Sequence, residues 1–184
     1  MTQPVLLLID LQMDYFPGGV LPLPNADLAV ARAARILGTF RSAALPVVHI
    51  RHESAKPGKG LFMPGTAGCD FHPVVQPLAG ETVLTKHKPN SFLGTGLEEL
   101  LRGLEPAPLA VCGMMTSMCV DAGVRAASDL GFDCLLLHDA CAAPDLEHNG
   151  VSVPGQQVHA AFVAALGQGY AQLAGVEELI NRLG

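Results

Sequence analysis

Short apolar runs alternate with amphipathic stretches along most of this chain. The apolar runs predict strands at residues 4–10, 45–50, 82–85, 107–111, 134–137 and 170–173. The amphipathic stretches predict helices after Asn25, from Thr95 to Leu101, from Ser117 to about Leu130, at 156–166 and at the end of the chain. Strands that alternate with helices build a parallel sheet covered on both faces. The pattern therefore predicts an α/β protein with a three-layer α/β/α, Rossmann-like fold around a mostly parallel central sheet of about six strands.

Polar residues mark where several of these helices begin. Asn25 and Thr116 are positioned to cap the helices that follow them, and Thr95 with Glu98 forms a T-x-x-E capping box. The side of the first helix that we expect to face the core carries Leu28, Ala31, Ile36 and Phe40. The stretches 51–80 and 139–154 have little periodicity and are expected to be loops that shape selectivity.

Composition narrows the class of protein. The 184 residues are 49 % hydrophobic and 15 % charged, which suits one domain over 1–184 with a single core. The net charge of −6, without a basic cluster, argues against nucleic acid or an anionic membrane as partner. The run Val5–Ile9 is too short for a signal segment, and no run reaches the length of a membrane span, so we expect a cytoplasmic protein. Five cysteines without a C-x-x-C pair indicate neither a disulfide framework nor a structural zinc site.

Three chemically competent residues are expected at the carboxyl ends of the strands, where ligands bind in such folds. Asp10 ends the first strand, Lys86 follows the third, and Cys119 lies just after the fourth. Taken singly, each has an ordinary explanation: a loop-capping carboxylate, an exposed lysine and a small buried cysteine. If Thr116 caps the helix, its dipole lowers the pKa of the Cys119 thiol and makes it a usable nucleophile. Asp10 can then act as general base, and Lys86 can stabilise both anions.

Four segments resemble one known family. They read LLLIDLQMDYF, KHKPNSFLGT, GMMTSMCVDAGVRAASDLGF and HDACAA, and they occur in the same order from residue 5 to about residue 165. These segments are similar to the D-x-Q strand, the lysine segment, the G-x-x-T-x-x-C-V signature and the D-A segment of the isochorismatase-like cysteine hydrolases, which include nicotinamidases. The resemblance therefore covers most of the chain.

The resemblance implies a role for each matching residue. Asp10 would be the acid and base, Lys86 its electrostatic partner, and Cys119 the nucleophile. It also implies a cis peptide bond at Met114–Met115, which would turn the Met115 N–H to face the same point as the Cys119 N–H, so that the two donors form an oxyanion hole. We expect no cofactor and a small-molecule amide as the substrate. Family members usually assemble as dimers or tetramers, so we expect a homodimer or homotetramer in which a neighbouring subunit contributes a wall.

Further residues near these segments are candidates for substrate binding. They are Gln12, Phe16, Phe62, Phe92 and Met118, and each is equally consistent with ordinary core packing. His52 and Glu53 follow the second strand and either reach the substrate or lie in a solvated loop.

A metal is not expected at this site. Nicotinamidases of the family carry a D-x-H motif near the second strand, whereas this chain reads HIRHESAKPG there. His49, His52 and His72 lack the required spacing, and His49 and His52 would point to opposite faces of a continuing strand.

The favoured function is hydrolysis of the C–N bond of a small cyclic or aromatic amide through a thioester. Two alternatives stay open. One is hydrolysis of a vinyl ether such as isochorismate, although family members that do this replace the cysteine. The other is a catalytically idle binding protein on the same fold. The absence of G-x-S-x-G, G-x-x-x-x-G-K-[ST] and G-x-G-x-x-G motifs argues against a serine α/β-hydrolase and a nucleotide-binding protein.

Overall fold

The computed structural model describes residues 3–56, 58, 60–104 and 107–184. Its central sheet has six strands in the order β3-β2-β1-β4-β5-β8, and all neighbouring pairs are parallel. The strands are β1 Val5–Ile9, β2 Val47–His52, β3 Thr82–Lys86, β4 Leu109–Met114, β5 Cys134–Ala142 and β8 Gln172–Ala174. The predicted α/β class and six-stranded sheet are confirmed.

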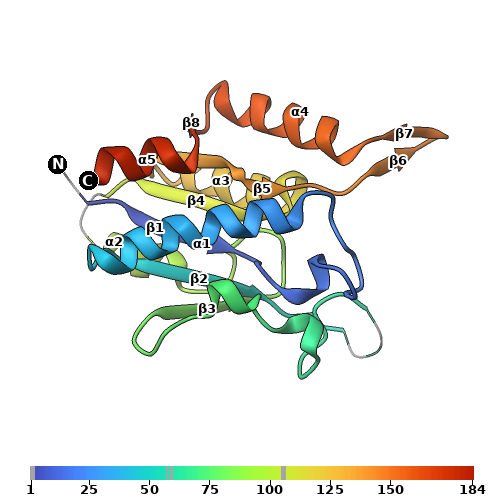
Figure 1. Ribbon diagram of the computed structural model, residues 1–184, viewed down its shortest axis with the longest axis horizontal. Helices are drawn as coiled ribbons and strands as arrows, with labels where there is room; N and C mark the ends of the chain where they lie inside the picture. Colours follow the sequence, from blue (N-terminus) through green and yellow to red (C-terminus); the bar gives the residue numbers. More distant parts are fainter. Residues whose placement is uncertain (1–2, 57, 59, 105–106) are drawn as a thin grey trace.

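Helices cover both faces of this sheet (Figure 1). The helices are α1 Ala26–Ser42, α2 Leu97–Arg102, α3 Asp121–Asp129, α4 Gly155–Gly167 and α5 Val176–Leu183. α1 packs against α5, and α3 packs against α4 on the opposite face. None of the helices in the described ranges is long and apolar enough to cross a membrane.

The core lies between these layers. Every residue of the central strands β1 and β4 is buried, because helices cover both of their faces. Three single-turn helices, Met13–Tyr15, Ala67–Cys69 and Pro73–Val75, lie in the segments that follow β1 and β2.

The predicted buried side of α1 was only half right. Ile36 and Phe40 are buried, whereas Leu28 is 60 % exposed and Ala31 is also exposed. Ala29 is buried instead, because it lies seven residues before Ile36, which is about two helical turns, and Leu28 is rotated from it by about 100°.

Of the predicted caps, Asn25 lies directly before its helix, whereas Gly96 rather than Thr95 precedes α2, and neither acts as predicted. Asn25 precedes α1 with a left-handed φ of 62°, and its side chain makes no capping hydrogen bond. The Thr95 hydroxyl accepts a hydrogen bond from Leu97 N, but Glu98 pairs with Arg102 four residues later instead of closing a capping box.

The stretch predicted as a loop at 139–154 is largely extended. β5 continues through Ala142, and an antiparallel hairpin follows, formed by β6 Leu146–His148 and β7 Val151–Val153. Figure 1 shows this hairpin projecting from the body of the molecule. Its sequence alternates too briefly to be recognised as a pair of strands.

Candidate active site

Asp10 and Lys86 form a fully buried ion pair at the carboxyl edge of the sheet. Asp10 directly follows β1 and has a φ of +50°, a strained conformation for a residue other than glycine. Lys86 ends β3, and its Nζ lies 2.7 Å from Asp10 Oδ2. The Lys86 side chain crosses the end of β2, which separates the two strands in the sheet. Its ammonium also donates to the carbonyl oxygens of Lys88 and Pro89, each at 3.2 Å.

Gly113 brings the end of β4 against β1. Its φ is +134°, and a Cβ at this position would lie 2.0 Å from the Ile9 carbonyl oxygen. Only glycine permits this approach. The peptide Met114–Met115 that follows is cis, as the resemblance implied. The chain then enters the turn that carries Cys119.

The local structure around Cys119 differs from the prediction. A π-helical turn spans Thr116–Val120, and α3 begins only at Asp121. Thr116 does not cap the turn, because its hydroxyl lies 2.9 Å from His159 Nδ1. Single π-helical turns recur at functional sites, but no residue pattern in the sequence distinguished this one from an α-helix.

The predicted lowering of the Cys119 pKa is also wrong. Burial raises the pKa of the Cys119 thiol well above its usual range, and the charge of Asp10 raises it further. The Lys86 ammonium opposes this shift without cancelling it. Desolvation is the largest of these effects, so the thiol carries its proton until a base removes it.

His52 completes a cluster of four functional side chains. Its Nδ1 lies 3.8 Å from Cys119 Sγ, 3.7 Å from Asp10 Oδ2 and 3.3 Å from Lys86 Nζ. The alternation of β2 places His52 and His49 on opposite faces, as expected from the sequence, and His49 contacts Glu81 instead. Register pairs His52 with Lys86, which explains why both reach the same point.

Of the other predicted contact residues, Phe62 and Gln12 contact His52, whereas Phe16 and Phe92 pack on other aromatic rings. Phe62 is buried and its ring lies 5.3 Å from that of His52. The Gln12 side chain holds the His52 backbone, accepting from its N–H at 2.8 Å and donating to its oxygen at 2.9 Å. Met118 is 46 % exposed beside Cys119. Phe16 packs on His72, and Phe92 stacks on Phe132.

Tyr15 is a site residue that the sequence reasoning missed. Burial raises the pKa of its phenol well above the usual range, and the charges of Asp10 and Asp14 act in the same direction. Its ring meets Phe62 edge-on, with 5.0 Å between the centroids. The available signal was its place in the turn that follows Asp10.

Three side chains of the cluster could in principle share a metal ion. One ligand atom from each of Asp10, His52 and Cys119 falls within 4.8 Å of the others, which is close enough to share an ion. The Lys86 ammonium, however, contacts both Asp10 Oδ2 and His52 Nδ1 and places a positive charge among these ligands. The arrangement therefore fits proton transfer better than a resident cation.

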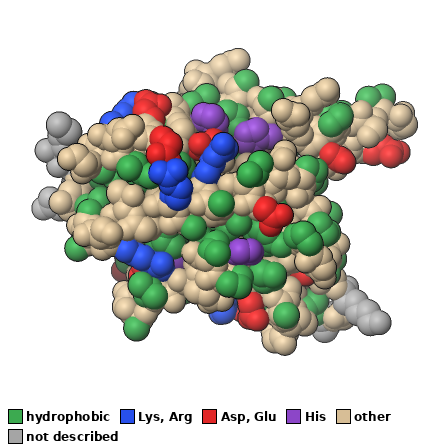
Figure 2. All heavy atoms as spheres, viewed as in Figure 1, with side chains coloured by type: hydrophobic (Ala, Val, Ile, Leu, Met, Phe, Trp, Pro, Cys, Tyr) green, Lys and Arg blue, Asp and Glu red, His purple; other side chains and the backbone are tan. Residues whose placement is uncertain are grey.

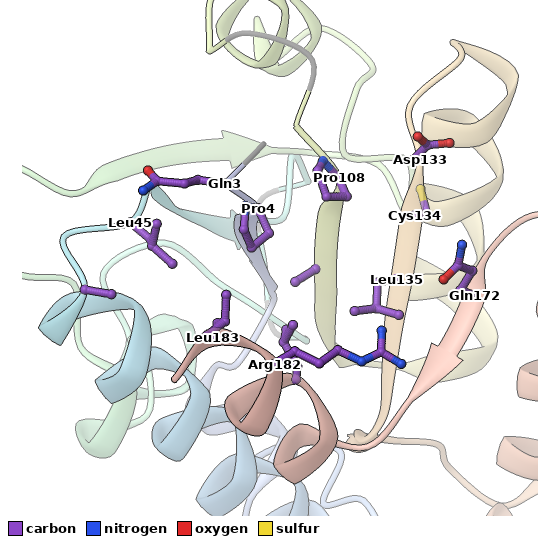
Figure 3. Close-up of a pocket in the computed structure, with 13 residues that line it drawn as sticks. Gln3, Pro4, Leu45, Pro108, Asp133, Cys134, Leu135, Gln172, Arg182 and Leu183 are labelled. Carbon is purple, nitrogen blue, oxygen red and sulfur yellow. The ribbon is translucent and has the colours of Figure 1, made fainter. Parts of the chain in front are cut away.

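A separate cavity lies at the other end of the strands, next to their amino-terminal residues. Its volume is about 510 Å³, and it is lined by residues of β4, β5, β8 and α5 and of the segment before β1, including Pro4, Cys134 and Arg182 (Figure 3). Asp10, Lys86 and Cys119 do not line it. On the face drawn in Figure 2, acidic and basic side chains are interspersed and no broad basic surface is visible.

Comparisons with known proteins agree with this geometry. The family model described as isochorismatase domain matches residues 4–169. The isochorismatase family protein YddQ of Bacillus subtilis is 42 % identical over 96 % of this chain and 98 % of its own length. A crystal structure of an isochorismatase hydrolase from Oleispira antarctica superposes with a TM-score of 0.93 at 46 % identity, covering 98 % of this chain and 97 % of the other. Maleamate amidohydrolase of Pseudomonas putida is 30 % identical over 74 % of this chain and 71 % of its own length.

The comparisons cover nearly the whole chain, and the segments that carry the buried cluster lie inside the matched range. The chain belongs to the isochorismatase family of hydrolases.

Proposed function

We propose that this protein hydrolyses the C–N bond of a small amide through a thioester on Cys119. The observation that carries the proposal is the buried Asp10–Lys86 pair, 2.7 Å apart, next to a buried thiol. A thiol whose pKa is raised needs a base held within reach, and a carboxylate beside it meets that need. Lys86 keeps the total charge of the site near zero when the thiolate forms.

The reaction proceeds in two halves. In the first, the thiol proton passes to Asp10, the thiolate sulfur attacks the amide carbon, and the C–N bond breaks as Asp10 protonates the leaving nitrogen. In the second, Asp10 takes a proton from water, hydroxide adds to the thioester, and the C–S bond breaks to release the acid. Asp10 returns its proton to the departing sulfur, which restores the thiol. Oδ1 of Asp10 is buried and has no hydrogen-bond partner among the described residues, so the carboxylate can accept a proton in addition to its contact with Lys86.

The backbone after β4 supplies the oxyanion hole in this scheme. Met115 lies between β4 and the π-helical turn, and within the described ranges no backbone carbonyl accepts its N–H. The N–H groups of Met115 and Cys119 would hold the negative oxygen of the tetrahedral intermediate. Two such donors contribute several kcal/mol to a transition state, on the order of 3 kcal/mol each.

The choice of an amide rests on Cys119 and on the relatives. A thiol is required for a thioester, whereas hydrolysis of a vinyl ether needs none. Maleamate amidohydrolase, by its name, acts on an amide. The buried cluster favours a small substrate, with Phe62 and Met118 as its walls. Gln12, Phe16 and Phe92 remain predicted contacts, and assembly as a homodimer or homotetramer remains a prediction.

The direct test is an ammonia-release screen over small cyclic and aromatic amides. Cys119→Ser should lower kcat by at least about 1,000-fold. Cys134→Ser is the matched control, because Cys134 is also buried but lies at the opposite edge of the sheet. Mass spectrometry of the quenched enzyme should show the acyl group on Cys119. Full activity in Cys119→Ser or Asp10→Asn would refute the scheme.

The same variants separate the alternatives. Isochorismate cleavage that survives Cys119→Ser would identify a vinyl ether hydrolase. A protein that releases no product from any of these substrates and has no fast-reacting cysteine would be an idle binding protein.

A further inference from the structure

The triad leaves His52 unassigned, although this side chain touches all three of its members. Nδ1 of His52 lies within 4 Å of Cys119 Sγ, Asp10 Oδ2 and Lys86 Nζ, at 3.8, 3.7 and 3.3 Å. Asp10 and Lys86 also lie within hydrogen-bond reach of the Cys119 thiol, so all four side chains meet at one point. The inference that follows rests on the proposed function.

The neighbours of His52 determine where its lone pair points. The Lys86 ammonium has only protons to donate, so Nδ1 must be the acceptor in their 3.3 Å contact. We therefore assign the neutral tautomer with its proton on Nε2. The Cys119 thiol also has a proton and lies within hydrogen-bond range of the same lone pair, at 3.8 Å. Both donors thus converge on one basic nitrogen.

The position of His52 is held from several sides. The Gln12 amide makes two hydrogen bonds to the His52 backbone, and the Phe62 ring lies against the imidazole at 5.3 Å, tilted by 33°. The Cys69 thiol contacts the His52 carbonyl at 3.7 Å. A side chain held in this way keeps the geometry that proton transfer requires.

His52 also differs from the triad in its access to water. Its side chain is 18 % exposed, whereas those of Asp10 and Lys86 are 0 % exposed. A proton held by His52 can therefore be stabilised by water at the ring edge, while the buried carboxylate and thiol have no such contact.

We propose that His52 is a further catalytic residue, which relays the thiol proton of Cys119 to Asp10. The S–H bond breaks, its electron pair stays on sulfur, and the Nδ1 lone pair forms the new N–H bond. The imidazolium then passes this proton to Asp10 Oδ2, 3.7 Å away, and becomes neutral again. The summed charge of the four groups is zero before, during and after the relay.

The charged and titratable groups that face His52 favour this path. Asp10 at the end of β1 stabilises the imidazolium, Lys86 at the end of β3 opposes it, and Cys119 in the π-helical turn forms an ion pair with it as a thiolate. Cys69 contacts only the His52 carbonyl. Because Asp10 lies 2.7 Å from Lys86, the ammonium charge that opposes the imidazolium is already partnered.

The test measures the rate at which iodoacetamide alkylates Cys119 between pH 5 and pH 10. His52→Gln removes the titrating ring but keeps a polar side chain, and His148→Gln is the control on the exposed β6 strand. His52→Gln should slow alkylation at pH 7 by about 100-fold and move its profile to higher pH. Its kcat on an amide should fall by a similar factor with KM unchanged, and imidazole should restore the alkylation rate of His52→Ala. His52→Asn replaces the alanine variant if that variant does not fold.

An alkylation profile of His52→Gln that superimposes on those of the parent protein and His148→Gln would overturn the relay. This readout needs no amide turnover, so it can fail while the amide hydrolase proposal stands. Conversely, His52→Gln could slow alkylation while the parent protein hydrolyses no amide. That result would support the thiol–histidine transfer and refute the proposed amide hydrolysis.

Discussion

Removing the Lys86 ammonium should destabilise the fold more than removing both charges of its ion pair. Lys86→Met keeps the length of the side chain but leaves the Asp10 carboxylate at 0 % exposure without its cation. Breaking a buried pair in this way costs about 3–5 kcal/mol, because the remaining charge is desolvated and uncompensated. Asp10→Asn should cost less, about 3 kcal/mol, because the ammonium keeps the carbonyl oxygens of Lys88 and Pro89 as acceptors.

The double variant Asp10→Asn/Lys86→Met contains neither charge. Its free energy of unfolding should fall by no more than about 3 kcal/mol. The two single substitutions together would cost at least about 6 kcal/mol if they were additive, so they should be non-additive by about 3 kcal/mol or more. Urea unfolding at pH 7, followed by circular dichroism, measures all four free energies of unfolding. Each variant should also lose amide hydrolysis, since Asp10 is the proposed base and Lys86 is its charge partner.

Additivity within about 0.5 kcal/mol would refute this reasoning, because it would mean that the two groups do not interact in the folded protein. Arg32→Gln/Asp139→Asn is a matched control pair. Arg32 and Asp139 lie 3.5 Å apart with side chains that are 50 % and 21 % exposed, so their coupling should stay below about 1 kcal/mol.

Three further outcomes are expected. Hydrogen bonds from Arg41 hold the pKa of Glu81 at about 2, below its ordinary value of 4.5, so its stabilisation is complete above pH 4.5 and is lost as the pH falls toward 2. Glu81→Gln should therefore lower stability at pH 7 by up to about 3 kcal/mol and flatten the acid side of a Tm–pH curve; an unchanged acid side would contradict this. Gly113→Ala places a Cβ 2.0 Å from the Ile9 carbonyl and should cost at least about 3 kcal/mol together with activity, which thermal melts and the amide assay can check. Phe40→Ala should cost about 3–5 kcal/mol in urea unfolding while kcat per folded molecule stays unchanged; a loss of kcat would show that α1 affects the site.

The meeting of Asp10, Lys86 and Cys119 could be predicted because the rule behind it is geometric. Parallel strands place their carboxyl ends at one edge of a sheet, so residues that follow three such strands converge whatever the intervening loops do. The family resemblance then identified which strand-end residues matter. The six-stranded architecture followed from the same alternation of strands and helices.

The ionisation of Cys119 could not be predicted in this way. Its position after a helix cap suggested a lowered thiol pKa, but the dominant effect is burial, which depends on residues distant in sequence. The π-helical turn Thr116–Val120 has no sequence signature that separates it from the first turn of α3. The contacts of His52 also required knowledge of how the segment between β2 and β3 brings Lys86 beside it.

Side chains of β2 alternate between the two faces of the sheet, and this limits which insertions and deletions the protein can accept during evolution. His49 and His52 lie on opposite faces of one strand, with His49 against Glu81 and His52 against the catalytic cluster. Deleting or inserting one residue ahead of His52 within β2 would turn it to the other face, while the composition of the strand would hardly change. A length change of one residue within β2 would therefore remove the imidazole from the catalytic cluster, whereas a change of two would keep it on the same face of the strand.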